Sequence, residues 1–408
     1  MSTILASDYE PLATAVQADP YPYYAALRRE APVCFVDSLQ AYAVSAHADV
    51  RRVMHDNVLF SSQAMAMLVS RPTQYMAGVD GITLEELEAL PVSIVGCDGA
   101  THTRLRLIVN RGFTPKRIGR IEDRVREIAR GFVSALVSNE SGDLQAGLCI
   151  PLPTIAIAEL LGVAPEQRDD FRRWSQYLVR AVFEPLDAAE QAEVTQGTVD
   201  MEAWLEGVIA ARAGAGGDDL VSVLLQAEAE GGALTPDELR VFVITLLVAG
   251  SITTAYLIGT AARRLSVDPA LLAWVRSDLG RAGAVVEESL RYDAPVQIMF
   301  RTATEDTEVA GTIIPAGATV AALLGAANRD ERVFPEPDLF DPRRDPTEHL
   351  AFGHGVHFCL GAALARLEAR VALEELLAGS DLLEPAGTPD YVSSLVFRGP
   401  TRLPLRYR

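Results

Sequence analysis

Residues 351–361 read AFGHGVHFCLG, and this stretch is the most informative one in the chain. Cys359 stands near the end of a loop with three glycines, and apolar residues recur at helical spacing across 362–377. The cysteine therefore precedes a helix N-terminus, where unpaired backbone N–H groups and the helix dipole stabilise a thiolate, a good soft metal ligand. Because glycine has no Cβ, a flat, bulky group can lie against this loop, with Phe352 packed beside it.

The same stretch resembles the cysteine-ligand loop of the cytochrome P-450 superfamily, the haem-thiolate monooxygenases, which reads F-G-x-G-x-H-x-C-x-G. All six defined positions are present, as Phe352, Gly353, Gly355, His357, Cys359 and Gly361. The resemblance implies that Cys359 is the axial ligand of the iron of haem b (iron protoporphyrin IX), with Phe352 and Gly361 against the cofactor. The alternative is a buried cysteine of no chemical role beside a flexible loop.

Composition limits the class of protein. The net charge of −19 argues against binding to nucleic acid or to anionic membranes. No linker or charge run divides the 408 residues, so we expect one domain, 1–408. The four cysteines are far apart and lack metal-ligand spacing, and the first residues lack the pattern of a signal peptide. We expect a reduced, cytoplasmic protein, and a monomer.

One uncharged segment, 241–262, is long enough to span a bilayer. It follows a capping box formed by Thr235 and Glu238, and three threonines and a serine interrupt its apolar residues. These features predict the buried central helix of a soluble protein rather than a membrane anchor.

The pattern along the chain predicts a mainly α fold with small β-sheets, which is the fold the resemblance implies: a long central helix over the haem and the cysteine loop beneath it. Beyond the central helix and the helix after Cys359, predicted helices cover 20–30, 48–55, 98–111, 118–139, 151–161, 165–183, 188–212 and 219–230. Predicted strands cover 33–36, 41–44, 297–302, 309–312, 319–324 and 394–398. Residues 61–96 show no period and predict a long loop, which covers the substrate pocket in the family.

The central helix carries Ala249-Gly250-Ser251-Ile252-Thr253-Thr254, which resembles the family's A-G-x-[D/E]-T-T. The resemblance places Ala249 and Gly250 over the haem. Glycine within a helix costs about 1 kcal/mol relative to alanine, and room for dioxygen is one reason to keep it. Thr253 then supplies the alcohol that helps deliver protons to haem-bound oxygen. Alternatively, Thr253 bonds back to the carbonyl four residues earlier and bends the helix.

The motif departs from the family at Ile252, where most members have Asp or Glu. An aliphatic side chain can neither relay a proton nor position water. Either Ser251, Thr254 and ordered water carry the relay, or proton delivery is slow and reduced oxygen escapes as peroxide.

Two further motifs concern the haem propionates. His102 and Arg106 are four residues apart and share a helical face, as in the family's H-x-x-x-R. The alternative is a solvated surface pair. By resemblance, Arg301 and His357 complete the propionate contacts.

A structural triad is expected around an E-x-x-R motif. Glu288 and Arg291 lie on one helical face, and Arg343 follows in a Pro-rich segment, 332–350. The resemblance implies that Arg343 clamps this segment onto the Glu288/Arg291 helix.

We therefore interpret the chain as a monooxygenase that inserts one atom of dioxygen into a hydrophobic small molecule (terpenoid, steroid, fatty acid or polyketide-like). By resemblance, electrons come from NAD(P)H through a reductase and a ferredoxin. The predicted ferredoxin patch is Arg104, Lys116, Arg117, Arg366 and Arg370. The predicted pocket residues are Met65, Met67, Phe183, Val248, Ile298, Met299, Val396 and Phe397. A peroxide-driven or non-oxidative haem-thiolate enzyme, and a non-catalytic haem sensor, are the alternatives.

Overall fold

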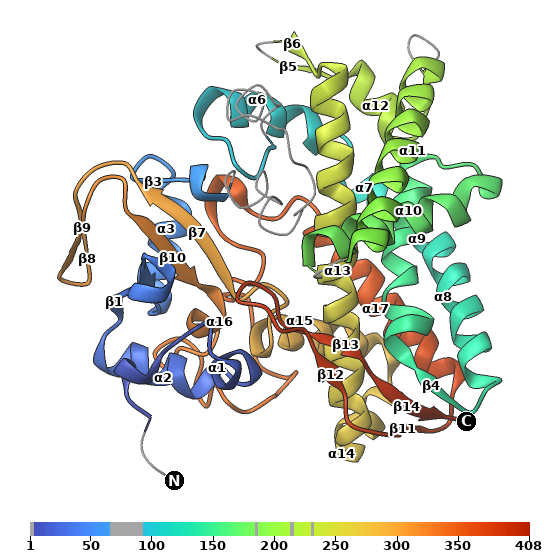
Figure 1. Ribbon diagram of the computed structural model, residues 1–408. Coiled ribbons are helices and arrows are strands. Elements are labelled where there is room, and N and C mark those ends of the chain that lie inside the picture. The colour runs from blue at the N-terminus through green and yellow to red at the C-terminus, as the bar shows by residue number, and fades with distance from the viewer. Residues whose placement is uncertain (1–3, 66–92, 184–186, 213–215, 230–231) are drawn as a thin grey trace. The chain divides into compact units, whose positions relative to one another are not determined.

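The computed structural model describes residues 4–65, 93–183, 187–212, 216–229 and 232–408 (Figure 1). The chain divides into two compact units. The first unit comprises Met1–Ala64, Arg124–Ile150 and Thr253–Arg408, and the second comprises Met65–Asp123 and Pro151–Ile252. The fold is mainly helical with small sheets, which confirms the predicted fold class.

A five-stranded sheet lies in the first unit, in the order β1-β2-β10-β7-β3. β10 runs parallel to β2, and the other neighbours are antiparallel. Helix α3 packs on β10, and the short helix α16 packs on both α3 and β7. The bounds are β1 Val33–Val36, β2 Ala41–Val44, β3 Phe60–Ser61, β7 Ile298–Ala303, β10 Thr319–Leu323, α3 His47–His55 and α16 Leu324–Ala327.

A hydrophobic core joins these elements, and four consecutive residues of β10 are buried, as in a strand that is covered on both faces. Val44, Val320 and Ala322 from the strands are fully buried, as are Val50 and Val53 of α3.

The rest of the first unit consists of helices and short antiparallel strand pairs. Helix α17 follows the cysteine loop and packs against α15. The helices are α1 Thr14–Ala18, α2 Tyr21–Glu30, α8 Glu122–Val137, α14 Pro269–Arg276, α15 Ala282–Tyr292 and α17 Ala362–Gly379. The strands are β4 Ser141–Asp143, β8 Thr307–Val309, β9 Thr312–Ile314, β11 Leu383–Pro385, β12 Asp390–Tyr391, β13 Pro400–Arg402 and β14 Pro404–Tyr407.

The second unit is nearly all helical. Helix α10 packs along α11 and α9, and α12 packs on α11. The elements are α6 Gly99–Asn110, α7 Pro115–Arg120, α9 Pro151–Leu161, α10 Arg168–Phe183, α11 Ala188–Arg212, α12 Leu220–Gln226 and the hairpin β5 Glu228–Ala229 with β6 Gly232–Ala233.

Helix α13, Pro236–Val267, contributes residues to both units. Its predicted capping box is present: the Glu238 N–H donates to Oγ1 of Thr235 at 3.1 Å, and the Thr235 N–H donates to Oε2 of Glu238 at 2.9 Å. The helix is long and apolar enough to cross a bilayer, but 56% of its most apolar 18-residue window is buried inside the protein. This burial agrees with the predicted core helix.

Three predicted elements differ from the structure. Residues 394–398 form a loop with one isolated bridge, between Val296 and Phe397. The backbone N–H groups of Val396 and Phe397 donate to Oγ of Ser394, which turns the chain there. Residues 309–312 contain the turn between β8 and β9 rather than a strand. The helix predicted over 219–230 ends at Gln226, and a strand begins at Glu228.

Candidate functional site

The cysteine loop presents its thiol at the surface of the first unit. Cys359 is exposed, although cysteine is among the most often buried residue types. Its backbone N–H donates to the carbonyl of Phe352 at 2.9 Å, which closes the loop ahead of α17. All four cysteines lie in the described part of the chain and none forms a disulfide. The thiol is therefore accessible at the end of a closed loop, and its role as the iron ligand stays a prediction.

Two loop glycines are required by the backbone. Gly353 and Gly355 have φ values of +72° and +77°, in the left-handed region that disfavours residues with a Cβ. A Cβ at Gly355 would also lie 3.0 Å from the Cα of His55 and from the carbonyl oxygen of Met54. The end of α3 therefore supports the loop closely from behind.

A polar cluster holds the start of the same loop. Arg366 of α17 pairs with Glu287 of α15 through Nε–Oε1 and Nη2–Oε2 distances of 2.6 and 3.1 Å. The Arg366 guanidinium lies 4.5 Å from the ring centre of Phe352. Glu287 also pairs at 3.2 Å with Nε2 of His349, whose Nδ1 accepts the backbone N–H of Ala351. Burial alone would raise the pKa of Glu287, but the bonds from His349 and Arg366 lower it to about 2.

The Glu288–Arg291 ion pair is fully buried on α15. Nε and Nη2 of Arg291 donate to the two carboxylate oxygens at 2.8 and 2.7 Å, and both side chains are 0% exposed. The same guanidinium donates to the carbonyls of Asn328, Pro337 and Leu339, so it fastens the Pro-rich segment to the helix.

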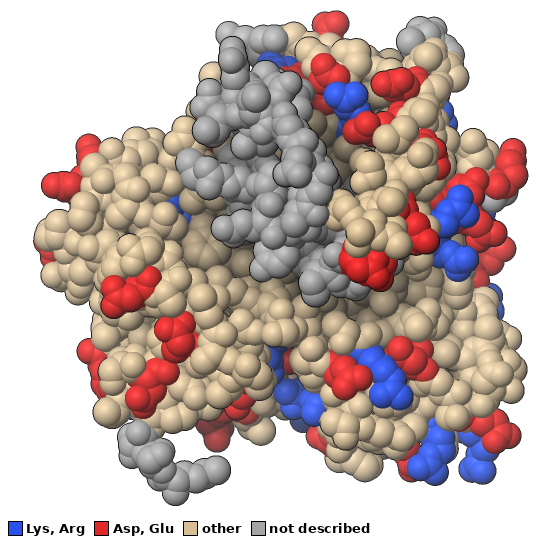
Figure 2. Space-filling model, in the orientation of Figure 1, with Lys and Arg blue, Asp and Glu red and all other residues tan. Residues whose placement is uncertain are grey.

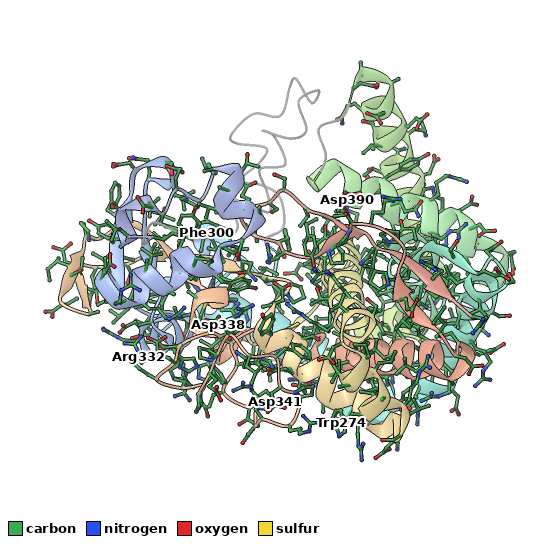
Figure 3. All side chains as sticks on the ribbon, turned by 90° about the horizontal axis from the view of Figure 1, so that it is seen from below. Trp274, Phe300, Arg332, Asp338, Asp341 and Asp390 are labelled. Carbon is green, nitrogen blue, oxygen red and sulfur yellow. The ribbon has the colours of Figure 1, made fainter. Side chains whose placement is uncertain are left out.

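The predicted third member of this triad, Arg343, is wrong by one residue. Nε of Arg344 donates to Oε1 of Glu288 at 3.1 Å, and its side chain is 12% exposed. Arg343 is 63% exposed and lies beside Asp341 and over the ring of Trp274, whose positions Figure 3 shows. The turn at Asp341 directs the second arginine inward, because the Asp341 N–H itself donates to Glu288.

Two predicted propionate contacts belong to the first unit. Arg301, on β7, is 1% exposed, and its Nη1 donates to the carbonyl of Phe300 at 2.8 Å. Nε2 of His357 lies 3.0 Å from Oγ of the buried Ser62, so that hydroxyl orients the imidazole. A buried guanidinium has a large desolvation cost, which a carboxylate partner offsets.

The other two predicted propionate contacts, His102 and Arg106, belong to α6 of the second unit. His102 is 3% exposed, and Arg106 is half-buried. Burial lowers the pKa of His102, and the charge of Arg106 lowers it further. His102 is therefore not a solvated surface side chain, and the contact of this pair with a propionate stays a prediction.

The hydroxyls of α13 fall on different faces. Ser251 and Thr254 are buried at 5% and 3% exposure, whereas Thr253 is half-buried and shares a helical face with the exposed Ala249. A Cβ at Gly250 would lie 2.9 Å from Cδ1 of Ile157, so close packing gives this glycine a reason besides room for dioxygen.

The predicted pocket residues have mixed environments. Met65 and Ile298 are buried, and Val248, Met299, Val396 and Phe397 are half-buried. Phe183 is the last residue of α10, and Met67 lies outside the described residues.

Most of the predicted ferredoxin patch is engaged in internal pairs. Arg104 pairs with Glu238, Arg366 with Glu287 and Arg370 with Glu374. Arg117 donates to the carbonyl of Asp218, and Lys116 is exposed. On the face that Figure 2 draws, blue side chains stand beside red ones rather than gathering.

The chemistry of Cys359 and of the predicted propionate contacts suits a haem. Within the described residues, no group of three or more His, Cys, Asp or Glu side chains could hold a metal ion. A single exposed thiol suits an iron whose remaining in-plane ligands come from a porphyrin. Arg301 of the first unit and Arg106 of the second carry guanidinium groups, which suit carboxylates, and the imidazole of His102 can donate a hydrogen bond.

Sequence reasoning missed Arg344, Ser62 and the Glu287–His349–Arg366 cluster. The doubled arginine at 343–344 was a signal that either residue could serve. No local pattern in the sequence indicates that Ser62 reaches His357, because 295 residues separate them.

Comparison with known proteins identifies similar chains. The family model for cytochrome P-450 matches residues 210–390. The chain is 40% identical to the erythromycin C-12 hydroxylase of Saccharopolyspora erythraea over 355 residues, which cover 86% of this chain and 85% of the relative. The solved structure of CYP109Q5 from Chondromyces apiculatus matches with a TM-score of 0.88 and 39% identity, covering 99% of both chains. The structure of CYP109E1 from Bacillus megaterium in complex with corticosterone matches with a TM-score of 0.85 and 31% identity, covering 96% of this chain and 99% of that one.

Proposed function

Since the chain belongs to the cytochrome P-450 family of monooxygenases, we propose that it hydroxylates a hydrophobic small molecule of the steroid or macrolide class. The observation that carries the proposal is the closed loop that presents the Cys359 thiol ahead of α17. The substrate class is supported by the relatives, one named an erythromycin hydroxylase and one solved with corticosterone. The half-buried, apolar Met299, Val396 and Phe397 suit such a substrate.

The residues present would hold a haem b as follows. Cys359 would ligate the iron as a thiolate, with Phe352, Gly361, Ala249 and Gly250 against the ring. The propionates would meet His102, Arg106, Arg301 and His357. When bound, the haem supplies the activation of dioxygen, which no side chain can perform.

The chain's own contribution is positioning and proton transfer. Thr253 would donate its hydroxyl proton toward the reacting oxygen, because it shares a face with the exposed Ala249. Ser251 and Thr254 point into packed surroundings, so a relay through them requires water that reaches the buried face of α13. Ile252 cannot take part.

Ile252 supports one second candidate, a peroxide-driven enzyme of the same family. Peroxide brings both oxygen atoms and the electrons, so the acid that Ile252 replaces is not needed for such a reaction. The peroxide-driven enzyme is the second candidate, because the chain has Thr253 at the motif position of the proton-delivering alcohol.

Electrons would come from NAD(P)H through a reductase and a small iron–sulfur ferredoxin. Because Arg104, Arg366 and Arg370 are paired internally, Lys116 is the patch member that has the most freedom to meet an acidic partner.

One experiment tests the proposal. Purified, haem-loaded protein is titrated with a panel of steroids, macrolides, terpenoids and fatty acids, and binding is followed by the Soret shift that accompanies loss of a water ligand. Binding compounds are then incubated with ferredoxin, reductase and NADPH, or with peroxide alone. We expect a hydroxylated steroid or macrolide from the first mixture. Product from peroxide alone supports the second candidate, and absence of product from both contradicts a monooxygenase.

A further inference from the structure

The C-terminal loop 394–398 lies along the start of β7. The Gln297 N–H donates to the carbonyl of Val396 at 2.7 Å, and the Arg398 N–H donates to the carbonyl of Pro295 at 2.9 Å. These two bonds place Val396 and Phe397 next to the first residues of β7, which are Ile298 and Met299. Two predicted pocket segments, about 100 residues apart in the chain, are therefore hydrogen-bonded side by side in the first unit.

A buried ion pair fixes this arrangement from the side. Nε of Arg398 donates to Oδ1 of Asp293 at 2.7 Å, and the two side chains are 14% and 5% exposed. Asp293 caps the C-terminal end of α15 and also accepts the Tyr21 hydroxyl at 2.5 Å. Nη1 of Arg398 donates to the carbonyls of Gln17 and Ala18, at 3.2 and 3.0 Å. The loop is thus attached to α15 and to the N-terminal segment through one guanidinium.

The electrostatics favour a fully ionised pair. Burial alone would raise the pKa of Asp293, but the charge of Arg398 and the hydrogen bond from Tyr21 lower it. Burial raises the pKa of Tyr21 well beyond its ordinary range, so the phenol remains a donor. Arg329 and Arg264 add positive charge to the same carboxylate.

A small cavity lies between the C-terminal loop and the N-terminal segment. It has a volume of about 20 Å³, and its walls include Phe397, Ile298 and Leu395 from the pocket side and Tyr9 and Tyr24 from the N-terminal segment. The space is about that of one water molecule, so the loop is not fully packed on this side. Arg398 holds the backbone next to Phe397.

We propose that the Asp293–Arg398 pair is a positioning device that sets the substrate-facing surface of Ile298, Met299, Val396 and Phe397, and thereby selects among ligands. The pair touches neither substrate nor cofactor in this role. The inference deepens the proposed function and rests on it where it concerns substrate.

The variants separate charge from shape. Asp293→Asn keeps the size and one acceptor but removes the charge, and Arg398→Lys keeps the charge but loses the fork of donors. Tyr21→Phe removes the hydroxyl that donates to Asp293 and accepts from Nε2 of Gln297 at 3.4 Å, but it keeps the Asp293–Arg398 pair, so it tests the device even if Asp293→Asn does not fold. The matched control is Arg402→Gln, because Arg402 pairs with Asp390 at 3.6 Å with both side chains more than half exposed.

The first readout is hydrogen–deuterium exchange of peptides that contain Gln297 and Arg398, in the holoprotein. We expect exchange about tenfold faster in Asp293→Asn and Arg398→Lys, with a smaller change in Tyr21→Phe and none in Arg402→Gln. This readout requires no catalysis, so it tests the anchor even if the proposed function is wrong. Wild-type exchange rates in Asp293→Asn, Arg398→Lys and Tyr21→Phe would overturn the proposal.

The second readout compares two nitrogen ligands of haem by Soret titration. Imidazole presents only its own ring, whereas 4-phenylimidazole adds a phenyl ring that needs more of the pocket. We expect the ratio of the two Kd values to change by about fivefold in Asp293→Asn and Arg398→Lys and to stay constant in Arg402→Gln. General destabilisation would alter both ligands together, so an unchanged ratio overturns the selective role. No spectral response of wild-type protein to imidazole would instead contradict the proposed function.

Discussion

Thr253 and Ser251 lie two residues apart on α13, yet their hydroxyls have different surroundings. Oγ of Ser251 is buried and has no hydrogen-bond partner among the described residues. Thr253 is half-buried on the face that carries Ala249. A hydroxyl can transfer protons only where the reacting atom can approach, and this difference favours Thr253 as the functional alcohol.

Replacing Thr253 by Ala should therefore uncouple the enzyme. The substitution removes the hydroxyl that we propose as the proton donor, so we expect a severalfold rise in hydrogen peroxide released per NAD(P)H consumed. The matched control is Thr260→Ala on the same helix, whose buried hydroxyl has no hydrogen-bond partner among the described residues. Peroxide yield would be measured beside NAD(P)H oxidation, and equal yields from Thr253→Ala and wild type would show that another group governs protonation.

The triad gives a second prediction for single residues. Arg344→Ala leaves Glu288, a fully buried carboxylate, with one arginine fewer, and we expect a loss of about 3 kcal/mol in unfolding free energy. Arg343→Ala should change it by no more than about 0.5 kcal/mol, because that side chain is exposed. Urea unfolding and the haem content of purified protein measure both. Equal effects of the two substitutions would contradict the assignment of Arg344.

At the scale of elements, α13 packs closely around its glycines. A Cβ at Gly259 would lie 1.9 Å from Nε2 of Gln145 and 2.8 Å from Cγ of Pro400. Gln145 is 0% exposed and its amide donates to the carbonyl of Ala255 at 3.5 Å, so it has little room to move. The glycine thus lets another segment approach the helix, at the cost of helix propensity.

We therefore expect Gly259→Ala to destabilise the protein by about 1–2 kcal/mol, since overpacking outweighs the gain in helix propensity. Gly131→Ala is the matched control: a Cβ there meets nothing within 4 Å, and the exposed interior of α8 should gain about 0.5–1 kcal/mol. Urea unfolding measures both. A stabilising Gly259→Ala, or no recovery when Gln145→Ala is added to it, would contradict this packing.

The cluster that joins α15, α17 and the cysteine loop has a predictable pH dependence. The pKa of Glu287 is lowered from 4.5 to about 2 in the folded protein, so the folded state binds fewer protons than the unfolded state between these values. The ionised carboxylate therefore stabilises the fold above pH 4.5, and this contribution is lost as the pH falls toward 2. Glu287→Gln should be less stable than wild type at pH 6, with a difference that shrinks at pH 3. Unfolding in urea at both pH values measures it, and a constant difference would contradict the role of ionisation.

Across the whole molecule, the features that could be predicted from the sequence are those formed by residues close together in the chain. The cysteine loop, the capping box of α13 and the E-x-x-R pair are each contained in a few adjacent residues, and their physical reasons are visible in the sequence. Helix α11 is a further example, because it begins and ends at the residues that the helical pattern of the sequence predicts, 188 and 212.

Contacts between distant residues could not be predicted in this way. Whether Arg343 or Arg344 reaches Glu288 depends on a turn, and the bond between Ser62 and His357 depends on the whole first unit. The short C-terminal strands β11 to β14 were missed because each has two to four residues and pairs with a partner chosen by the fold. Arg398, which lies among these strands, gave no signal of its contact with Asp293.

Ligation of haem iron by Cys359 can be measured through the spectrum of the ferrous carbonyl adduct. We expect the red-displaced absorption that thiolate ligation produces in haem-loaded wild type and in Cys34→Ser, and its loss in Cys359→Ser. The same absorption in Cys359→Ser, or its absence from the haem-loaded wild type, would show that Cys359 is not the ligand.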